Sequence, residues 1–92
     1  MDDTTQTTKE KILETVIGIL KKQKRFQNLE ITEKTHLDRD LKINATETSK
    51  FGRGIELSFG IQITSNTMVF LRDMESLVFY IDTQIFKKIS DA

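Results

Sequence analysis

The sequence predicts an all-α fold, a small bundle of three main helices and one short helix. Three stretches carry apolar residues at the spacing of one helix face. No run alternates apolar and polar residues as a half-buried strand does. A helix bundle buries all three apolar stripes at once. With 92 residues the chain suffices for one domain, so we expect a single domain over 1–92, with flexible tails at about 1–8 and 87–92.

The first predicted helix follows the polar N-terminal segment, with Thr8 as its N-cap. Its apolar face comprises Ile12, Leu13, Val16, Ile17 and Leu20. Basic residues gather just beyond it, where the negative end of the helix dipole favours cations: Lys21, Lys22, Lys24 and Arg25. A nucleic-acid site is an alternative interpretation of this cluster, but only Phe26 adds an aromatic ring. We therefore interpret the cluster as a solvated helix end.

The segment 26–43 loses helical periodicity and predicts a long loop. Its apolar residues are isolated: Leu29, Ile31, Leu37 and Leu41. Loops of this length are uncommon in compact domains, so we expect these side chains to pin the loop across the core. The single histidine, His36, has no second histidine or cysteine to complete a metal site, and we expect a surface side chain.

The second helix is predicted from Ala45 to Phe59. Asn44 can cap the free amides of its first turn, and Glu47 can reach back to the N–H of Asn44. Gly60 can take the left-handed conformation that ends a helix. The apolar stripe consists of Phe51, Ile55 and Phe59.

The remaining residues predict a short helical segment and a final helix. The short segment contributes Met68, Val69 and Phe70. Asp73 caps the final helix, and Lys87 and Lys88 lie at its negative end. The stripe of this helix is Met74, Leu77, Val78, Ile81 and Ile85. We expect one shared core that includes Val16, Leu20, Phe51, Ile55, Phe59, Leu77 and Ile81.

Composition excludes several classes of function. Fourteen basic and fourteen acidic residues cancel, so net charge does not favour nucleic acid or membrane surfaces. There is no cysteine, and no apolar run approaches the ~20 residues of a membrane span. The N-terminus is polar and acidic, unlike a signal peptide, so a cytoplasmic protein is expected. We find no Gly-rich phosphate loop, no metal-ligand spacing and no nucleophile near a histidine, and we expect a non-enzyme.

Residues 40–63 resemble the acyl carrier proteins and the related peptidyl carrier domains. In that family Leu-Gly-x-Asp-Ser-Leu opens the second helix, and Glu-x-x-Phe-Gly-Ile-x-Ile closes it. Without a gap, Leu41 falls on the first leucine, and Asn44, Ala45 and Thr46 fall on Asp-Ser-Leu. The closing run is matched by Glu56, Phe59, Gly60, Ile61 and Ile63. Ala45 thus takes the place of the serine that carries 4′-phosphopantetheine.

The resemblance extends over about residues 12–81. The family's long first loop is matched by Ile31, Thr32, Thr35, Leu37, Asp40 and Leu41. Its last helix is matched by Leu71, Asp73, Met74, Leu77, Tyr80 and Ile81. No single motif is decisive, but their joint spacing is specific.

The resemblance implies an acyl carrier protein-like function, in which acyl intermediates travel as thioesters on 4′-phosphopantetheine in fatty-acid or polyketide-type biosynthesis. It implies a monomer that meets a phosphopantetheinyl transferase and a synthase, acyltransferase or ligase. Alanine has no hydroxyl, so no arm can attach at Ala45. Attachment at Ser49 would need a register shift that breaks the match over 59–63.

The partner-binding surface implied by the resemblance consists of Asn44, Thr46, Glu47, Lys50 and Arg53. Its charges are mixed, whereas the family's second helix is acidic, so a partner with complementary mixed charge is expected. Two interpretations of Ala45 remain. In the first, the serine of a working carrier was replaced by alanine so that the whole protein stays without the 4′-phosphopantetheine arm. In the second, the chain is a naturally armless carrier-fold protein that acts by binding or regulation.

Two glycines in the second helix, Gly52 and Gly54, allow two explanations. Each costs ~1 kcal/mol relative to alanine in a helix interior. Close packing against a neighbouring helix, or simple tolerance, is the preferred explanation. Room for an acyl chain, or a helix that shifts, is the functional alternative. Thr46 in place of leucine, the neutral net charge and these glycines support the armless interpretation.

Overall fold

The computed structural model describes residues 4–90 and is built of helices. In chain order these are α1 (Thr4–Leu20), the 3₁₀ turn η1 (Lys24–Phe26), α2 (Ala45–Phe59), α3 (Ser65–Phe70) and α4 (Met74–Ser90). Over residues 4–90 there is no strand, and a single isolated bridge joins His36 to Asp73. The prediction of an all-α bundle with three main helices and one short helix is confirmed.

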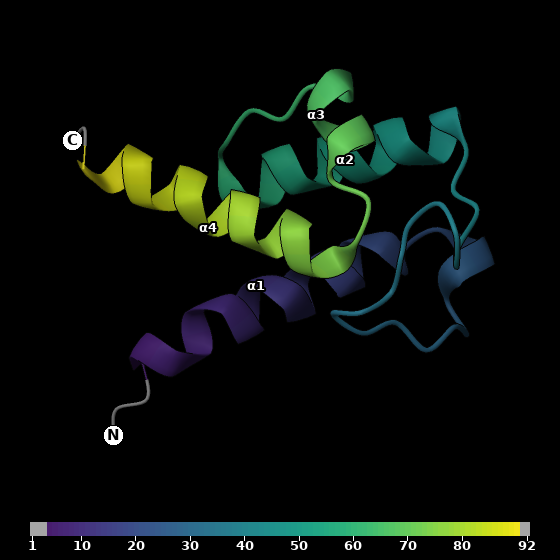
Figure 1. The fold of residues 1–92 in the computed structure, drawn as a ribbon, viewed down its shortest axis with the longest axis horizontal. Coiled ribbons are helices and arrows are strands. Elements are labelled where there is room, and N and C mark those ends of the chain that lie inside the picture. Colours follow the sequence, from purple (N-terminus) through teal and green to yellow (C-terminus); the bar gives the residue numbers. More distant parts are fainter. Residues whose placement is uncertain (1–3, 91–92) are drawn as a thin grey trace.

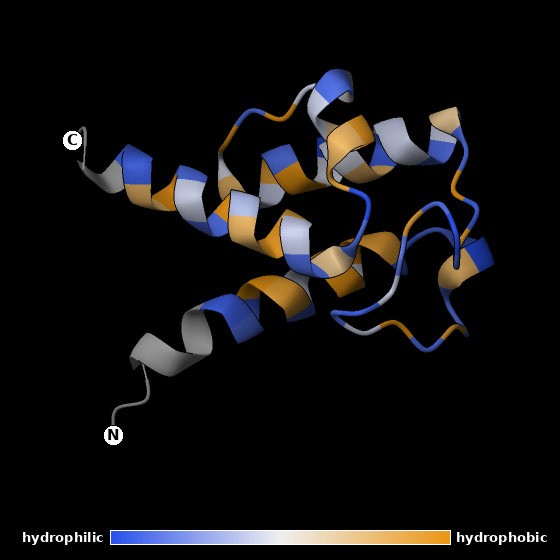
Figure 2. Ribbon diagram, in the orientation of Figure 1, coloured by the Kyte–Doolittle hydropathy of each residue, from blue (hydrophilic) through white to orange (hydrophobic). Residues whose placement is uncertain are grey.

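The helices form a bundle in which α1 lies against α4 and α2, and α3 lies against α2 (Figure 1). The start of α1 and the end of α4 lie at one end of the molecule, and the long loop between η1 and α2 lies at the other (Figure 1). Figure 2 shows apolar residues interleaved with hydrophilic ones along α1, α2 and α4, as amphipathic helices require. None of the helices within residues 4–90 has the length and apolar character needed to cross a membrane.

The boundaries of α2 confirm the predicted capping. The Asn44 side chain accepts a hydrogen bond from the Glu47 N–H at 2.8 Å, and the Glu47 carboxylate accepts one from the Asn44 N–H at 3.0 Å. Gly60 ends the helix with φ 66° and ψ 35°. The Asp73 carboxylate accepts from the Ser76 N–H at 2.7 Å, which confirms Asp73 as the cap of α4.

The predicted tails are too long. Helix α1 already begins at Thr4, so Thr8 lies inside it, and α4 continues through Ser90. Once a helix has formed, each added residue gains a hydrogen bond at little further cost, and lysines are favoured in the last turn. Lys88 also donates to the Gly60 carbonyl at 2.7 Å, which holds the end of α4 against the end of α2. Residues 1–3 and 91–92 lie outside the described residues.

One core occupies the space between the helices and confirms most of the predicted core residues. Six of them are buried: Val16, Leu20, Phe51, Ile55, Leu77 and Ile81. Phe59 is only half-buried and packs at the edge of this core. Phe26, which the periodicity did not single out, is fully buried at the end of η1.

The long loop is pinned as predicted, with one exception. Ile31, Leu37 and Leu41 are buried, whereas Leu29 is 40% exposed, so its predicted core position is wrong. Backbone hydrogen bonds tie the loop to the start of α4: Leu37 N to Arg72 O at 2.6 Å, Met74 N to Thr35 O at 3.0 Å and Glu75 N to Glu33 O at 3.0 Å. These bonds occupy backbone groups that would otherwise stay unpaired near the core.

His36 is half-exposed at the surface, and its Nδ1 accepts a hydrogen bond from the Arg39 N–H at 2.9 Å, which shapes a turn of the loop. One smaller prediction is corrected. Of the three apolar residues of α3, Met68 is buried, whereas Val69 and Phe70 are exposed. A six-residue helix presents one narrow face to the core, and residues that follow Met68 directly point away from it.

Candidate functional site

Ala45, which the predicted resemblance aligns with the serine of the carrier proteins, is the first residue of α2 and is exposed. Asn44 precedes it in an extended conformation, with φ −95° and ψ 177°. The first amides of a helix have no intrahelical partner and can receive an anion. Ala45 offers no hydroxyl for attachment, so the residues present do not fit a covalently bound 4′-phosphopantetheine.

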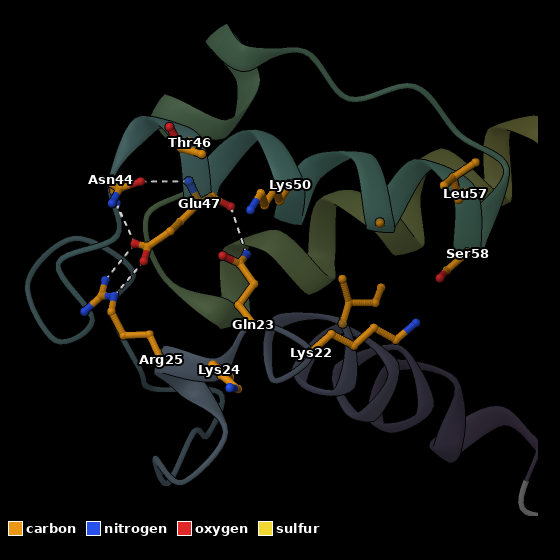
Figure 3. A pocket seen from close by; sticks show the side chains of 12 residues that line it. Lys22, Gln23, Lys24, Arg25, Asn44, Thr46, Glu47, Lys50, Leu57 and Ser58 are labelled. Atoms are coloured by element: carbon orange, nitrogen blue, oxygen red, sulfur yellow. Dashed lines mark hydrogen bonds and ion pairs between the residues drawn. The ribbon is translucent and has the colours of Figure 1, made fainter.

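An ion pair fixes the acidic residue of this helix start. Arg25 donates through Nε to Glu47 Oε2 at 2.6 Å and through Nη2 to Glu47 Oε1 at 2.7 Å (Figure 3). The Glu47 side chain is 14% exposed and the Arg25 side chain 46%. The Arg25 hydrogen bond, with a smaller contribution from the Asn44 N–H, lowers the pKa of Glu47 from 4.5 to about 2. Glu47 therefore stays ionised throughout the neutral range.

The same arginine also ties the long loop to α2. Its Nη2 donates to the carbonyls of Leu41, at 2.9 Å, and Lys42, at 3.1 Å. Gln23 donates to the Glu47 carbonyl at 3.1 Å (Figure 3). Lys22, Lys24 and Arg25 are exposed, as predicted for a solvated helix end, but the guanidinium group of Arg25 also binds the Glu47 carboxylate and two carbonyl oxygens of the loop before α2. Sequence periodicity gives no signal of this contact, which joins residues far apart in the chain.

Lys42 has a backbone conformation that favours glycine. Its φ is 50°, the only positive φ of a non-glycine residue among residues 4–90. A side chain at such a position is strained by contact with its own backbone. Lys42 falls on the glycine of the family's Leu-Gly-x-Asp-Ser-Leu pattern. The left-handed turn before α2 is therefore present here without the glycine that would favour it.

A groove of about 740 Å³ runs between the end of α1, with the η1 segment, and one face of α2 (Figure 3). Four of the five predicted partner-binding residues line it: Asn44, Thr46, Glu47 and Lys50. Arg53 does not, and lines a separate recess of about 330 Å³ beside Ser49. The opposite wall was not predicted as a site and includes Ile19, Lys22, Gln23, Lys24 and Arg25.

The two glycines of α2 differ in their surroundings. A Cβ on Gly54 would lie 2.5 Å from Ile19 Cγ2, so α2 approaches α1 more closely than an alanine would allow. A Cβ on Gly52 would meet Met68 Cγ at 3.7 Å and Ile63 Cγ2 at 3.9 Å, which are ordinary contacts. Close packing thus explains Gly54, and Gly52 is a tolerated residue in a site that can hold a methyl group.

Over residues 4–90, no group of three or more histidine or acidic side chains is arranged to hold a metal ion. No protein-family model matches this chain, and a search of curated proteins finds no match for it.

Proposed function

We propose that this chain is an acyl carrier-like protein in which Ala45 stands at the attachment position for 4′-phosphopantetheine. The supporting observation is the placement of Ala45, which is exposed at the first position of α2, directly after the N-cap Asn44 and inside the capping box that Asn44 forms with Glu47. A serine at this position would present its hydroxyl to solvent beside the free amides of the helix start. The left-handed turn at Lys42 adds support, because it falls where the family pattern has glycine.

In the proposed role, the surface around Ala45 meets two kinds of protein. One is a phosphopantetheinyl transferase, and the other is a synthase, acyltransferase or ligase that handles the acyl group. A carrier with a serine at this position would hold acyl groups as thioesters on the arm, whereas this chain, with Ala45, cannot be loaded there. Asn44, Thr46, Glu47 and Lys50 surround the attachment position and would touch the partner.

The test is restoration of the hydroxyl. Ala45→Ser should gain one phosphopantetheine from coenzyme A when mixed with a broad-specificity phosphopantetheinyl transferase, and intact-mass measurement reads the gain directly. The unaltered chain should gain nothing. Ala45→Ser/Ser49→Ala is the matched control and should be modified equally, because Ser49 lies one turn further along α2. Modification of the unaltered chain would move the attachment site to another hydroxyl.

A second function is favoured by the charges at the helix start. Glu47 is bound to Arg25, and lysines line the groove beside it, so this face lacks the acidic surface expected of a carrier. This favours a naturally armless carrier-fold protein that acts by protein binding or regulation. If several different transferases fail to modify a folded Ala45→Ser variant, the result would favour the naturally armless protein over the carrier. The codon at position 45 of the native gene separates a replaced serine from a natural alanine.

A further inference from the structure

The groove between α1 and α2 has one wall built from a single face of α2. Glu47, Lys50, Gly54 and Leu57 follow one another at helical spacing, and all four line the groove (Figure 3). The other wall is the end of α1 and the η1 segment, which brings Lys22 and Lys24 opposite α2 (Figure 3). The two walls come from segments about a quarter of the chain apart, joined through the Arg25 and Gln23 hydrogen bonds to Glu47.

The groove carries an excess of positive charge. Lys22, Lys24 and Lys50 line it, their side chains are exposed, and no ion pair among the described residues engages them. Glu47 is the sole acidic residue of the lining, and Arg25 already neutralises it. The whole chain is neutral, so this excess is a local property of the groove and not a consequence of composition.

The groove also has an apolar end. Leu57 is 78% exposed there, although it is a large aliphatic side chain. Ile19 also borders the groove, but it is only 8% exposed, because α2 lies directly on it at Gly54. An occupant that carries only negative charge would leave this apolar surface uncovered.

We propose that this groove binds a short acidic segment of a partner protein, with acidic side chains at Lys22, Lys24 and Lys50 and an aliphatic or aromatic side chain on Leu57. The partner's acidic side chains complement the three lysines, and its apolar side chain covers the exposed Leu57. A nucleic acid fits less well, because no aromatic side chain lines the groove on which a base could stack. The surface is formed without any group at Ala45, so the proposal does not depend on whether the chain carries an arm.

The experiment begins with selection of short random peptides displayed on phage against the full-length chain. The expected peptides carry several Asp or Glu residues and at least one Leu, Ile or Phe. Enrichment of neutral or basic peptides, or no enrichment, would overturn the proposal. Binding of the labelled selected peptide is then measured by fluorescence anisotropy, with an oligothymidylate as competitor. Displacement of the peptide by the oligothymidylate at equal concentration would indicate a nucleic-acid site instead.

Matched variants locate the site. Lys22→Gln/Lys24→Gln/Lys50→Gln should weaken peptide binding by about tenfold, because three exposed charge pairs are lost. Lys11→Gln/Lys34→Gln/Lys87→Gln removes the same charge from exposed lysines outside the groove and should change binding less than the groove variant. Equal weakening by both variants would mean that net charge alone drives binding.

The apolar contact has its own control. Leu57→Ala should weaken peptide binding, whereas Phe70→Ala, which truncates an even more exposed side chain on α3, should leave it unchanged. Backbone amide NMR shifts provide a readout that does not depend on substitution, and the peptide should perturb Lys22, Lys50 and Leu57. Shifts confined to α4 would place the peptide elsewhere and reject the groove.

Discussion

Lys42 is the residue at which local conformation and residue type disagree most clearly. A non-glycine side chain in the left-handed region costs about 1–2 kcal/mol, and a glycine costs about 0.4–1 kcal/mol through the entropy of the unfolded chain. Lys42→Gly should therefore raise the free energy of unfolding by about 0.5–1 kcal/mol. Urea denaturation checks this, with Lys42→Ala as the control that removes the side chain but keeps the strain. Equal stability of the glycine and alanine variants would contradict the assigned backbone conformation.

The Arg25–Glu47 pair predicts a specific dependence of stability on pH. The folded-state pKa of Glu47 is lowered to about 2, below the 4.5 of the free side chain. The stabilisation from its ionised form is therefore complete above about pH 4.5 and is lost as pH falls toward 2. The unfolding free energies of the wild type and Glu47→Gln should converge over this interval, as measured by urea denaturation at a series of pH values.

Arg25→Gln provides the control for this assignment. Loss of the Arg25 guanidinium group should raise the pKa of the Glu47 carboxyl group, because the Arg25 hydrogen bond is the largest cause of the lowered pKa. Carbon-detected NMR of the side-chain carboxyl measures the midpoint directly. An unchanged midpoint would assign the shift to the helix start instead of to Arg25.

At the scale of helices, α2 carries a matched pair of glycines. Alanine at either position gains about 1 kcal/mol of helix propensity. At Gly54 the added methyl group would collide with Ile19, whose branched side chain has little rotamer freedom in α1. Gly54→Ala should therefore be about 1–3 kcal/mol less stable than Gly52→Ala. The comparison uses thermal or urea unfolding of the two variants, and equal stabilities would show that α1 and α2 lie further apart.

At the scale of the whole molecule, the centre of the core includes Phe26 of η1, whereas Phe59, at the end of the α2 stripe, lies at its edge. Phe26 is fully buried and Phe59 only half-buried, so Phe26→Ala should cost about 3–5 kcal/mol and Phe59→Ala clearly less. Phe26→Leu should cost less than Phe26→Ala, because it leaves a smaller cavity, and it keeps a folded protein for comparison if the alanine variant unfolds. Urea denaturation ranks the three variants. A greater loss at Phe59 would place the centre of the core along α2.

Sequence by itself determined the elements of this protein. The helical class, the start of α2 at Asn44, its end at Gly60 and most of the buried positions in the stripes of the three long helices follow from interactions within a few residues. Capping bonds span three residues, and an amphipathic stripe repeats every turn, so both appear in the linear pattern. The start of α1 near Thr4 was missed because the polar residues before Lys9 belong to no apolar stripe.

Tertiary structure alone decided the surroundings of the candidate site. The position of Ala45 at the start of α2 was evident from its neighbours in the chain, but the groove beside it was not. Arg25 and Glu47 are 22 residues apart, and nothing in the spacing of either indicates that they meet. Phe26 was likewise missed because it lies outside any helical stripe. Such contacts depend on how the loop returns across the core, and that path is set by packing and backbone hydrogen bonds between distant segments.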